Sequence, residues 1–352
     1  MDADLDLLLT TVFCTADDLP PERRGNAARR VTDAEVVTLC VAQAIMGIPC
    51  DRRFLAVAGK RLGHLFPELP KQPGYFKRRR RLGDALEWLL GVREPEPGSQ
   101  EDLLLIDSTP VPCAQSRETV RRSALADAAD YGWCASHSRY FWGFRLHAIF
   151  APDGTPRALA LTSPKTDERD VALGLLARCK RRGGEILLGD KGYAGRAFAA
   201  AVSDLDATIL RPRRRDEPGQ GPQLAPIRQR IESIFWTCKD ILTLERPGAR
   251  TLAGLRERVL QRFVCLAAAI TLNHQLGRPT RALVNYSTTN EPLWLRWRQA
   301  RSWCIVRRKL LRSGHPPAVR QRHSGVGYEP SSRAARPVCE DPRLDRVQRA
   351  AA

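Results

Sequence analysis

The sequence predicts an α/β protein: a mixed sheet with flanking helices, preceded by an all-α region and followed by a basic tail. The first hundred residues carry apolar side chains at helical spacing, residues 101–286 alternate short apolar runs with helical patterns, and residues 287–352 are rich in Arg, Pro and Ser. Between the first two parts, VREPEPGSQ at 92–100 breaks every periodic pattern. We therefore expect a helical domain at 1–91, a linker at 92–100 and a second domain at 101–286.

The helical region contains a clear helix start at Thr32. Thr32 can cap the helix, Glu35 lies three residues later, and Val31 and Val36 are placed as a hydrophobic staple. Helical spacing continues through three stretches: 33–46, 51–66 and 72–91.

Five basic residues follow one another in the third of these stretches: Lys77, Arg78, Arg79, Arg80 and Arg81. They are either the phosphate-contacting face of a small DNA-binding domain or the solvated start of a helix. The formal net charge of +18 makes nucleic acid the leading partner class. A GC-rich genome would also enrich Arg and Ala, so charge alone does not decide between these interpretations.

The region 101–286 has the element order of the ribonuclease H-like fold. The expected strands are LLLIDST (103–109), RYFWGFRLHAIF (139–150), RALALTSP (157–164), EILLGD (185–190) and ATILRP (207–212). The expected helices are 168–182, 195–204, 224–244 and 251–276. Three strands in a meander, followed by alternating helices and strands, predict a mixed sheet covered by helices.

Two of the expected strands end in the same way, with an apolar run followed by an acid. Asp107 follows LLLI and Asp190 follows EILLG. In an open α/β sheet ligands bind beyond the carboxyl ends of strands, where an acid is held rigidly and remains accessible. A single Asp at such a place is more often a turn former or helix cap, but the repetition favours a shared site.

The expected helix at 224–244 supplies a third acid. At about 100° per residue, Arg228, Glu232 and Lys239 fall on one helix face. A neighbouring face is apolar and consists of Ile227, Ile231, Ile234, Cys238 and Ile241. This helix can pack on the sheet and present Glu232 between two bases, or Arg228 and Glu232 can form an ordinary surface ion pair.

Three carboxylates from different elements predict metal-assisted phosphoryl transfer. Mg²⁺ prefers oxygen ligands, and two ions about 3.5–4 Å apart can activate the attacking oxygen and stabilise the leaving oxygen. Because like charges this close repel one another, we expect two Mg²⁺ ions as cofactor, with Mn²⁺ as a substitute. The sequence contains neither GxxxxGK[ST] nor GxGxxG, so a nucleotide phosphate loop is not predicted.

Other polar residues nearby receive structural roles. We expect His147 to pack on the sheet and Asp153 to form the hairpin turn with Gly154. Asp167, Glu168 and Asp170 are expected at the start and first turn of a helix.

Several motifs together resemble the DDE transposases of bacterial insertion sequences, in particular the insertion sequence 982 group. They are IDSTPVPC, YGWCASHSRYFWGFRLH, PDGTPRALALT, DERDVALGLL, GDKGY and LAPIRQRIESIF, within a resemblance that runs from about Leu5 to Tyr286. The resemblance implies a ribonuclease H-like core with Asp107, Asp190 and Glu232 as the DDE triad and metal ligands. Arg228, Lys239 and Lys191 are then expected to contact DNA, although Ala225 stands where some related groups carry a Tyr.

The same resemblance implies a reaction. The enzyme would cleave at the ends of its element and transfer the freed 3′-hydroxyls into target DNA, as a homodimer or higher multimer that pairs two ends. The N-terminal helices would recognise the terminal inverted repeats. The alternatives are a metal-dependent nuclease or resolvase on the same core, and a decayed element product that binds DNA without catalysis.

The C-terminal end of the chain, from Gly277 onward, carries most of the net charge. From Gly277 onward 16 Lys and Arg face 5 Asp and Glu, a balance of +11. The tail is either a DNA-binding segment, in which Trp294, Trp297 and Trp303 stack on bases, or a disordered frameshifted or read-through extension.

The cysteines and the N-terminus bear on location. Ten cysteines are scattered without a CxxC pair, as expected of small buried apolar residues in a reducing compartment. The acidic start MDADLDLLLT is unlike a leader, and no apolar run approaches the roughly 18 residues of a membrane helix. We expect a cytoplasmic, nucleoid-associated bacterial protein.

Overall fold

The computed structural model describes residues 3–18, 30–91, 102–114, 116–134, 138–179, 181–213 and 224–287. The predicted linker at 92–100 and the tail from residue 288 onward lie outside these residues. The N-terminal part is helical, as predicted, with α1 (Ala3–Asp17), α2 (Asp33–Ile45), α3 (Asp51–Arg61), α4 (Gln72–Arg81) and α5 (Gly83–Gly91).

The predicted start of α2 is confirmed in detail. The Thr32 hydroxyl accepts a hydrogen bond from the Glu35 amide at 3.1 Å, and the Glu35 carboxylate accepts one from the Thr32 amide at 2.5 Å. This capping box satisfies two of the amides that a helix start leaves unpaired. Val31 and Val36 are both buried, as a hydrophobic staple requires.

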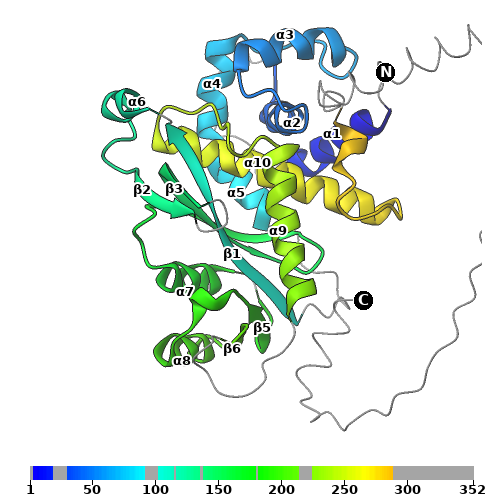
Figure 1. Ribbon diagram of the computed structural model, residues 1–352. Coiled ribbons are helices and arrows are strands. Elements are labelled where there is room, and N and C mark those ends of the chain that lie inside the picture. The colour runs from blue at the N-terminus through cyan, green and yellow to red at the C-terminus, as the bar shows by residue number, and fades with distance from the viewer. Residues whose placement is uncertain are drawn as a thin grey trace, which may run out of the picture.

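A six-stranded mixed sheet forms the centre of the second part (Figure 1). Its strands are β1 (Leu103–Ala114), β2 (Asp130–Cys134), β3 (Arg139–Phe150), β4 (Pro156–Thr162), β5 (Glu185–Leu188) and β6 (Ala207–Leu210). The order is β2-β3-β1-β5-β6, and β4 pairs with β3 on the same edge as β2. The meander strands are antiparallel, whereas β1, β5 and β6 are parallel. The predicted fold class is confirmed, with β2 as an additional strand.

Helices cover both faces of this sheet. The helices of this part of the chain are α6 (Arg117–Arg122), α7 (Glu168–Arg178), α8 (Arg196–Asp204), α9 (Ala225–Asp240) and α10 (Leu252–Gln275), with the 3₁₀ turns η2 (Lys191–Tyr193) and η3 (Leu283–Tyr286). Because successive strand residues face opposite sides, Leu104 and Ile106 of β1 pack with α7 and α8, whereas Leu103 and Leu105 pack into the larger core that includes α9 and α10. Figure 1 shows α9 running along β1.

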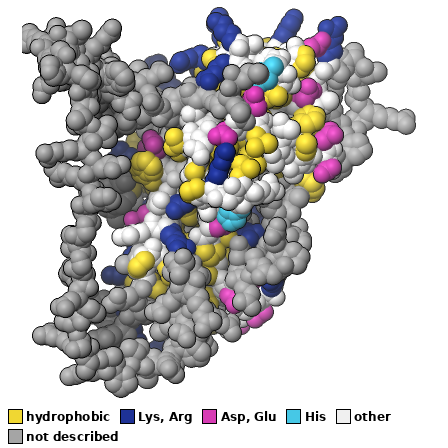
Figure 2. Space-filling model, turned by 90° about the vertical axis from the view of Figure 1, so that its right-hand side faces the viewer, with side chains coloured by type: hydrophobic (Ala, Val, Ile, Leu, Met, Phe, Trp, Pro, Cys, Tyr) yellow, Lys and Arg dark blue, Asp and Glu magenta, His cyan; other side chains and the backbone are white. Residues whose placement is uncertain are grey.

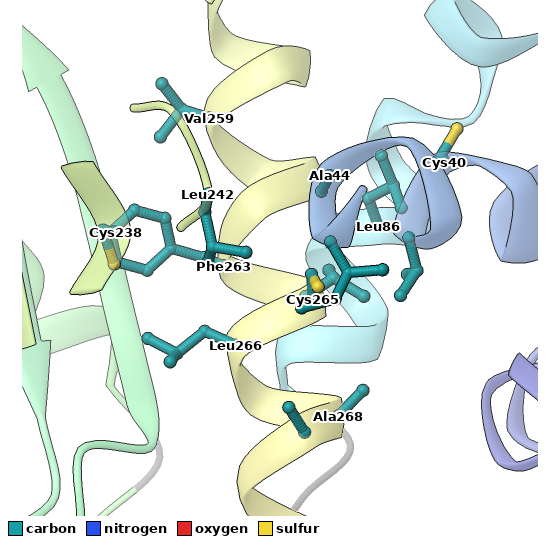
Figure 3. Close-up of a cluster of buried hydrophobic side chains, with 14 of the residues drawn as sticks. Cys40, Ala44, Leu86, Cys238, Leu242, Val259, Phe263, Cys265, Leu266 and Ala268 are labelled. Atoms are coloured by element: carbon teal, nitrogen blue, oxygen red, sulfur yellow. The ribbon is translucent and has the colours of Figure 1, made fainter. Parts of the chain in front are cut away.

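The long helix α10 lies between the sheet and the N-terminal helices (Figure 3). On one side Phe263 stacks on Phe150 of β3, with ring centroids 6.0 Å apart. On the other side Cys265 faces α2 and α5, where Ala44 and Leu86 lie. One apolar core therefore contains residues from both predicted domains, and the boundary at 92–100 stays a prediction.

A buried polar network links α3, α4 and α10. Arg79 pairs with Asp51 at 2.6 Å and with Glu257, and Arg258 also pairs with Asp51 at 2.5 Å. Although burial raises the pKa of Asp51, the hydrogen bond from Arg79 and the charge of Arg258 bring that pKa below its ordinary value. The prediction that Arg79 belongs to a DNA-contacting face is wrong in this structure, because its side chain is only 3% exposed.

Among the described helices, none is both long enough and apolar enough to cross a membrane.

Candidate active site

Asp107 and Asp190 lie at equivalent places on neighbouring parallel strands. The ladder of hydrogen bonds between β1 and β5 ends at the pair Leu105 and Leu188. Asp107 lies two residues after Leu105, and Asp190 lies two residues after Leu188. β1 itself continues to Ala114, paired with β3 along its other edge. Asp190 therefore follows the end of its strand, as predicted, whereas Asp107 lies inside a strand that is longer than predicted.

Local hydrogen bonds fix both carboxylates. Asp107 Oδ1 accepts from the amide of Ser108 at 2.7 Å. Asp190 caps η2, and its Oδ1 accepts from the amide of Gly192 at 2.7 Å. Each carboxylate is thereby oriented by the backbone that follows it.

The electrostatic environment of Asp107 shows that the acids share a site. Burial raises the pKa of Asp107 to about 7, the Ser108 amide lowers it, and the charges of Asp190 and Glu168 raise it. Arg228 of α9 lowers the pKa of Asp107. Two carboxylates and one guanidinium from three other elements therefore act on this one carboxyl group.

Glu168 is the acid that sequence reasoning left out of the site. It is the first residue of α7, capped by Asp167 as predicted, but its side chain turns toward the acids. Glu168 Oε1 accepts from the Ser108 hydroxyl at 3.2 Å and pairs with Arg145 of β3. The only sequence signal was its place at the start of the helix after the meander, and a helix start commonly carries an acid for other reasons.

Tyr193 of η2 is a buried residue on which the charges of the acids act. Its side chain is 1% exposed, and its hydroxyl has no hydrogen-bond partner among the described residues. Burial and the charges of Asp107, Glu168 and Asp190 raise the pKa of Tyr193 well above its ordinary value. The charges of three carboxylates thus act on a neutral, buried hydroxyl.

The face pattern predicted for α9 is confirmed. The apolar set Ile227, Ile231, Ile234, Cys238 and Ile241 is buried. Arg228 is half-buried, Glu232 is exposed, and Lys239 pairs with Glu245 at 3.5 Å. The structure therefore brings Arg228 to Asp107, and Glu232 lies one turn further along α9 at the surface.

The acids offer oxygen ligands of the kind that divalent cations prefer. The raised pKa of Asp107 and the orphaned hydroxyl of Tyr193 both fit a cation with its water ligands at this place. In the described part of the chain, however, no group of three or more His, Cys, Asp or Glu side chains is arranged to hold a metal ion directly.

The remaining residues predicted to bind DNA lie apart from the acids, except Lys191, which follows Asp190 and is exposed. On α4, Lys77, Arg80 and Arg81 are exposed, whereas Arg78 pairs with Asp33. Sequence reasoning missed that α3 packs against α4 and adds exposed basic residues: Arg52, Arg53, Lys60 and Arg61. In Figure 2 several Lys and Arg side chains project along the top of the molecule, the height at which α3 and α4 lie in Figure 1.

The structural roles predicted for two other residues are confirmed. His147 is fully buried and its Nε2 lies 3.1 Å from the Thr162 hydroxyl. Asp153 accepts from the Thr155 amide at 2.7 Å within the turn between β3 and β4.

Comparison with known proteins adds a family to this geometry. Residues 98–268, which contain Asp107, Asp190 and Glu232, match the transposase DDE domain. No curated protein matches the sequence. Among solved structures, the chain is similar to the piggyBac transposase synaptic complex with hairpin DNA, determined by cryo-EM, with 10% sequence identity and a TM-score of 0.43 over 92% of this chain and 85% of that chain.

The paired acids lie within the matched domain, and this match supports a DDE transposase enzyme. Enzymes with this domain generally depend on divalent metal ions.

Proposed function

We propose that this protein is the transposase of a bacterial insertion sequence of the 982 group, which cleaves at the ends of its element and joins the freed 3′-hydroxyls to target DNA. The observation that carries the proposal is the placement of Asp107 and Asp190 two residues beyond the last pair of neighbouring parallel strands, inside the matched domain. The quoted motifs support the narrower assignment to the 982 group.

Asp107, Asp190 and Glu232 are the proposed ligands of two Mg²⁺ ions, for which Mn²⁺ substitutes. The bound metal would supply activation of the attacking oxygen and stabilisation of the leaving oxygen. Arg228, whose charge lowers the pKa of Asp107, is the proposed contact for a DNA phosphate beside the acids, because an Arg can bind a phosphate through two hydrogen bonds. Lys191 and Lys239 complete the proposed contacts near the acids.

The exposed basic residues of α3 and α4 are the proposed surface for the terminal inverted repeats. Both helices present cations without a balancing run of acids, and phosphate contacts of this kind hold a protein in register on a duplex. The protein is proposed to act as a homodimer or larger multimer that holds two DNA ends, in the bacterial cytoplasm.

The decisive experiment uses DNA that carries the sequences flanking the gene, incubated with purified full-length protein and Mg²⁺. Wild type should give 3′-hydroxyl ends at fixed positions and products joined to target DNA. Asp190→Asn and Glu232→Gln should abolish both products while DNA binding remains. Cleavage without joined products would instead identify a nuclease, and binding without cleavage would identify a protein that has lost catalysis.

If Glu232→Gln keeps full activity while Asp190→Asn loses it, Glu232 is not the third acid. The exposed position of Glu232 on α9 makes this outcome informative. Asp170→Asn, which removes an exposed acid from the first turn of α7, is the matched control and should behave as wild type.

A further inference from the structure

We propose that Glu168 is a fourth acid of the active site, whose carboxylate binds the water ligands of the divalent cation held at Asp107 and Asp190. This inference rests on the proposed function, since it assumes that the cation binds at Asp107 and Asp190. It assigns a role to a residue that the DDE triad does not include.

The position of Glu168 supports this role. Glu168 Oε1 is held by the Ser108 hydroxyl at 3.2 Å and by Arg145, so the carboxylate has a fixed orientation. Glu168 Oε2 lies 3.6 Å from the point where a Cβ on Gly192 would stand, and Asp190 Oδ1 lies 2.9 Å from that same point. The second oxygen of Glu168 and the Asp190 carboxylate thus both lie close to the Cα of Gly192.

Two further observations connect Glu168 with the catalytic acids. Ser108 donates a hydrogen bond to Glu168 and is the residue directly after Asp107. The strand β1 therefore carries both the catalytic acid Asp107 and the partner of Glu168. The buried Tyr193 hydroxyl, which has no partner in the described part of the chain, is influenced by the charges of Asp107, Glu168 and Asp190 together. Buried hydroxyls normally have a hydrogen-bond partner, and the water of a hydrated cation would provide one.

The arrangement also explains how Glu168 can act without direct chelation. Mg²⁺ usually keeps several of its water ligands and takes only one or two carboxylates directly. A carboxylate that binds those waters contributes charge and hydrogen bonds, and removing such a group typically costs about 10- to 100-fold in metal affinity.

The competing explanation is that Glu168 serves only as the partner of Arg145. Two substitutions separate the explanations. Our proposal predicts that one of them weakens Mn²⁺ binding and that the other does not. Glu168→Gln keeps an oxygen that can accept from Arg145 and Ser108 but removes the negative charge. Arg145→Met removes the partner and a positive charge, while the Glu168 carboxylate remains.

The measurement is calorimetric titration of the full-length protein with Mn²⁺ in the absence of DNA. We expect Glu168→Gln to weaken Mn²⁺ binding about tenfold or more, and Arg145→Met to leave it unchanged or strengthen it. Asp170→Asn, with the same charge change in the same helix turn, should bind as wild type. Equal weakening by Glu168→Gln and Arg145→Met, or no weakening by Glu168→Gln, would overturn the proposal.

Asp190→Asn distinguishes this inference from the proposed function. If Asp190→Asn removes Mn²⁺ binding and Glu168→Gln does not, only the role of Glu168 fails. If neither substitution changes Mn²⁺ binding, the metal site itself is wrong. Should Glu168→Gln fail to fold, Glu168→Asp retains the charge on a shorter side chain, and wild-type affinity in that variant would contradict the requirement for an oxygen at the Glu168 position.

Discussion

At the scale of single residues, the Tyr193 hydroxyl is a cost to the fold that the proposed site explains. It is buried without a partner among the described residues, and an unpaired buried polar group costs about 1–3 kcal/mol. Tyr193→Phe should therefore leave the free energy of unfolding unchanged or raise it by up to about 3 kcal/mol, while Mn²⁺ affinity falls. Urea denaturation in the presence of a chelator and calorimetry measure the two effects.

Tyr286→Phe is the matched control for that substitution. The Tyr286 side chain is also buried, but its hydroxyl donates to Asn273 Oδ1 at 2.6 Å. Its removal should lower the free energy of unfolding by about 1 kcal/mol without changing Mn²⁺ affinity. A large loss of stability in Tyr193→Phe would show that the Tyr193 hydroxyl does have a partner in the apo protein.

His147 gives the folded state a dependence on pH. Burial, together with the charge of Arg145, lowers the pKa of His147 to about 4. Because the unfolded chain takes up this proton near pH 6.5, the folded state loses stability as the pH falls from about 6.5 to about 4, by about 3 kcal/mol. Above that window the neutral imidazole contributes no pH dependence.

The corresponding experiment compares wild type with His147→Gln by urea denaturation between pH 4 and pH 8. The variant should be less sensitive to acid over that range, whatever its stability at neutral pH. Parallel curves for the two proteins would show that His147 is not the group responsible.

The sequence predicted the meeting of Asp107 and Asp190 from the apolar run that precedes each acid. Asp107 nevertheless lies inside β1, two residues beyond the last pair that β1 forms with β5. The sequence could not predict the role we propose for Glu168, whose orientation depends on contacts with Ser108 and Arg145 from strands distant in sequence. Arg79 was misassigned for a similar reason. A run of five basic residues on a helix points in several directions, and only packing against α10 decides which of them is buried.

At the scale of elements, α4 combines a structural and a binding side. Arg79→Ala removes a cation from a buried pair with Asp51 and Glu257 and should lower the free energy of unfolding by about 3–5 kcal/mol. Arg80→Ala, on the exposed side of the same helix, should leave stability within about 0.5 kcal/mol and weaken DNA binding. Urea denaturation and a salt-dependent binding titration measure these effects.

A reversed pattern, in which Arg79→Ala keeps its stability and loses DNA affinity, would contradict the assignment of sides on α4.

The same helix could be predicted from its spacing, but its end at Arg81 and the separate α5 could not. The strand β2 was missed because DYGWC is short and pairs only with β3. Its strand conformation therefore depends on a neighbour rather than on its own pattern.

At the scale of the whole molecule, the last described segment closes the N-terminal helices onto α10. Leu283 and Tyr286 of η3 are fully buried, and Arg278 pairs with Asp4 of α1 at 2.9 Å. We therefore expect truncation after Ser287 to retain the fold and the metal-dependent chemistry. Truncation after Ala282 should lower the free energy of unfolding by at least about 3 kcal/mol, because it removes two buried side chains from the core.

The two truncations differ by five residues and so form their own control, with urea denaturation and Mn²⁺ calorimetry as the measurements. They also address the net charge, since most of it lies beyond Gly277. If the truncation after Ser287 binds DNA with an unchanged salt dependence, the exposed cations of the described part account for binding, as α3 and α4 predict. If that truncation is soluble but does not bind Mn²⁺, the tail takes part in the site, and the placement of the catalytic machinery entirely within residues 101–286 is wrong.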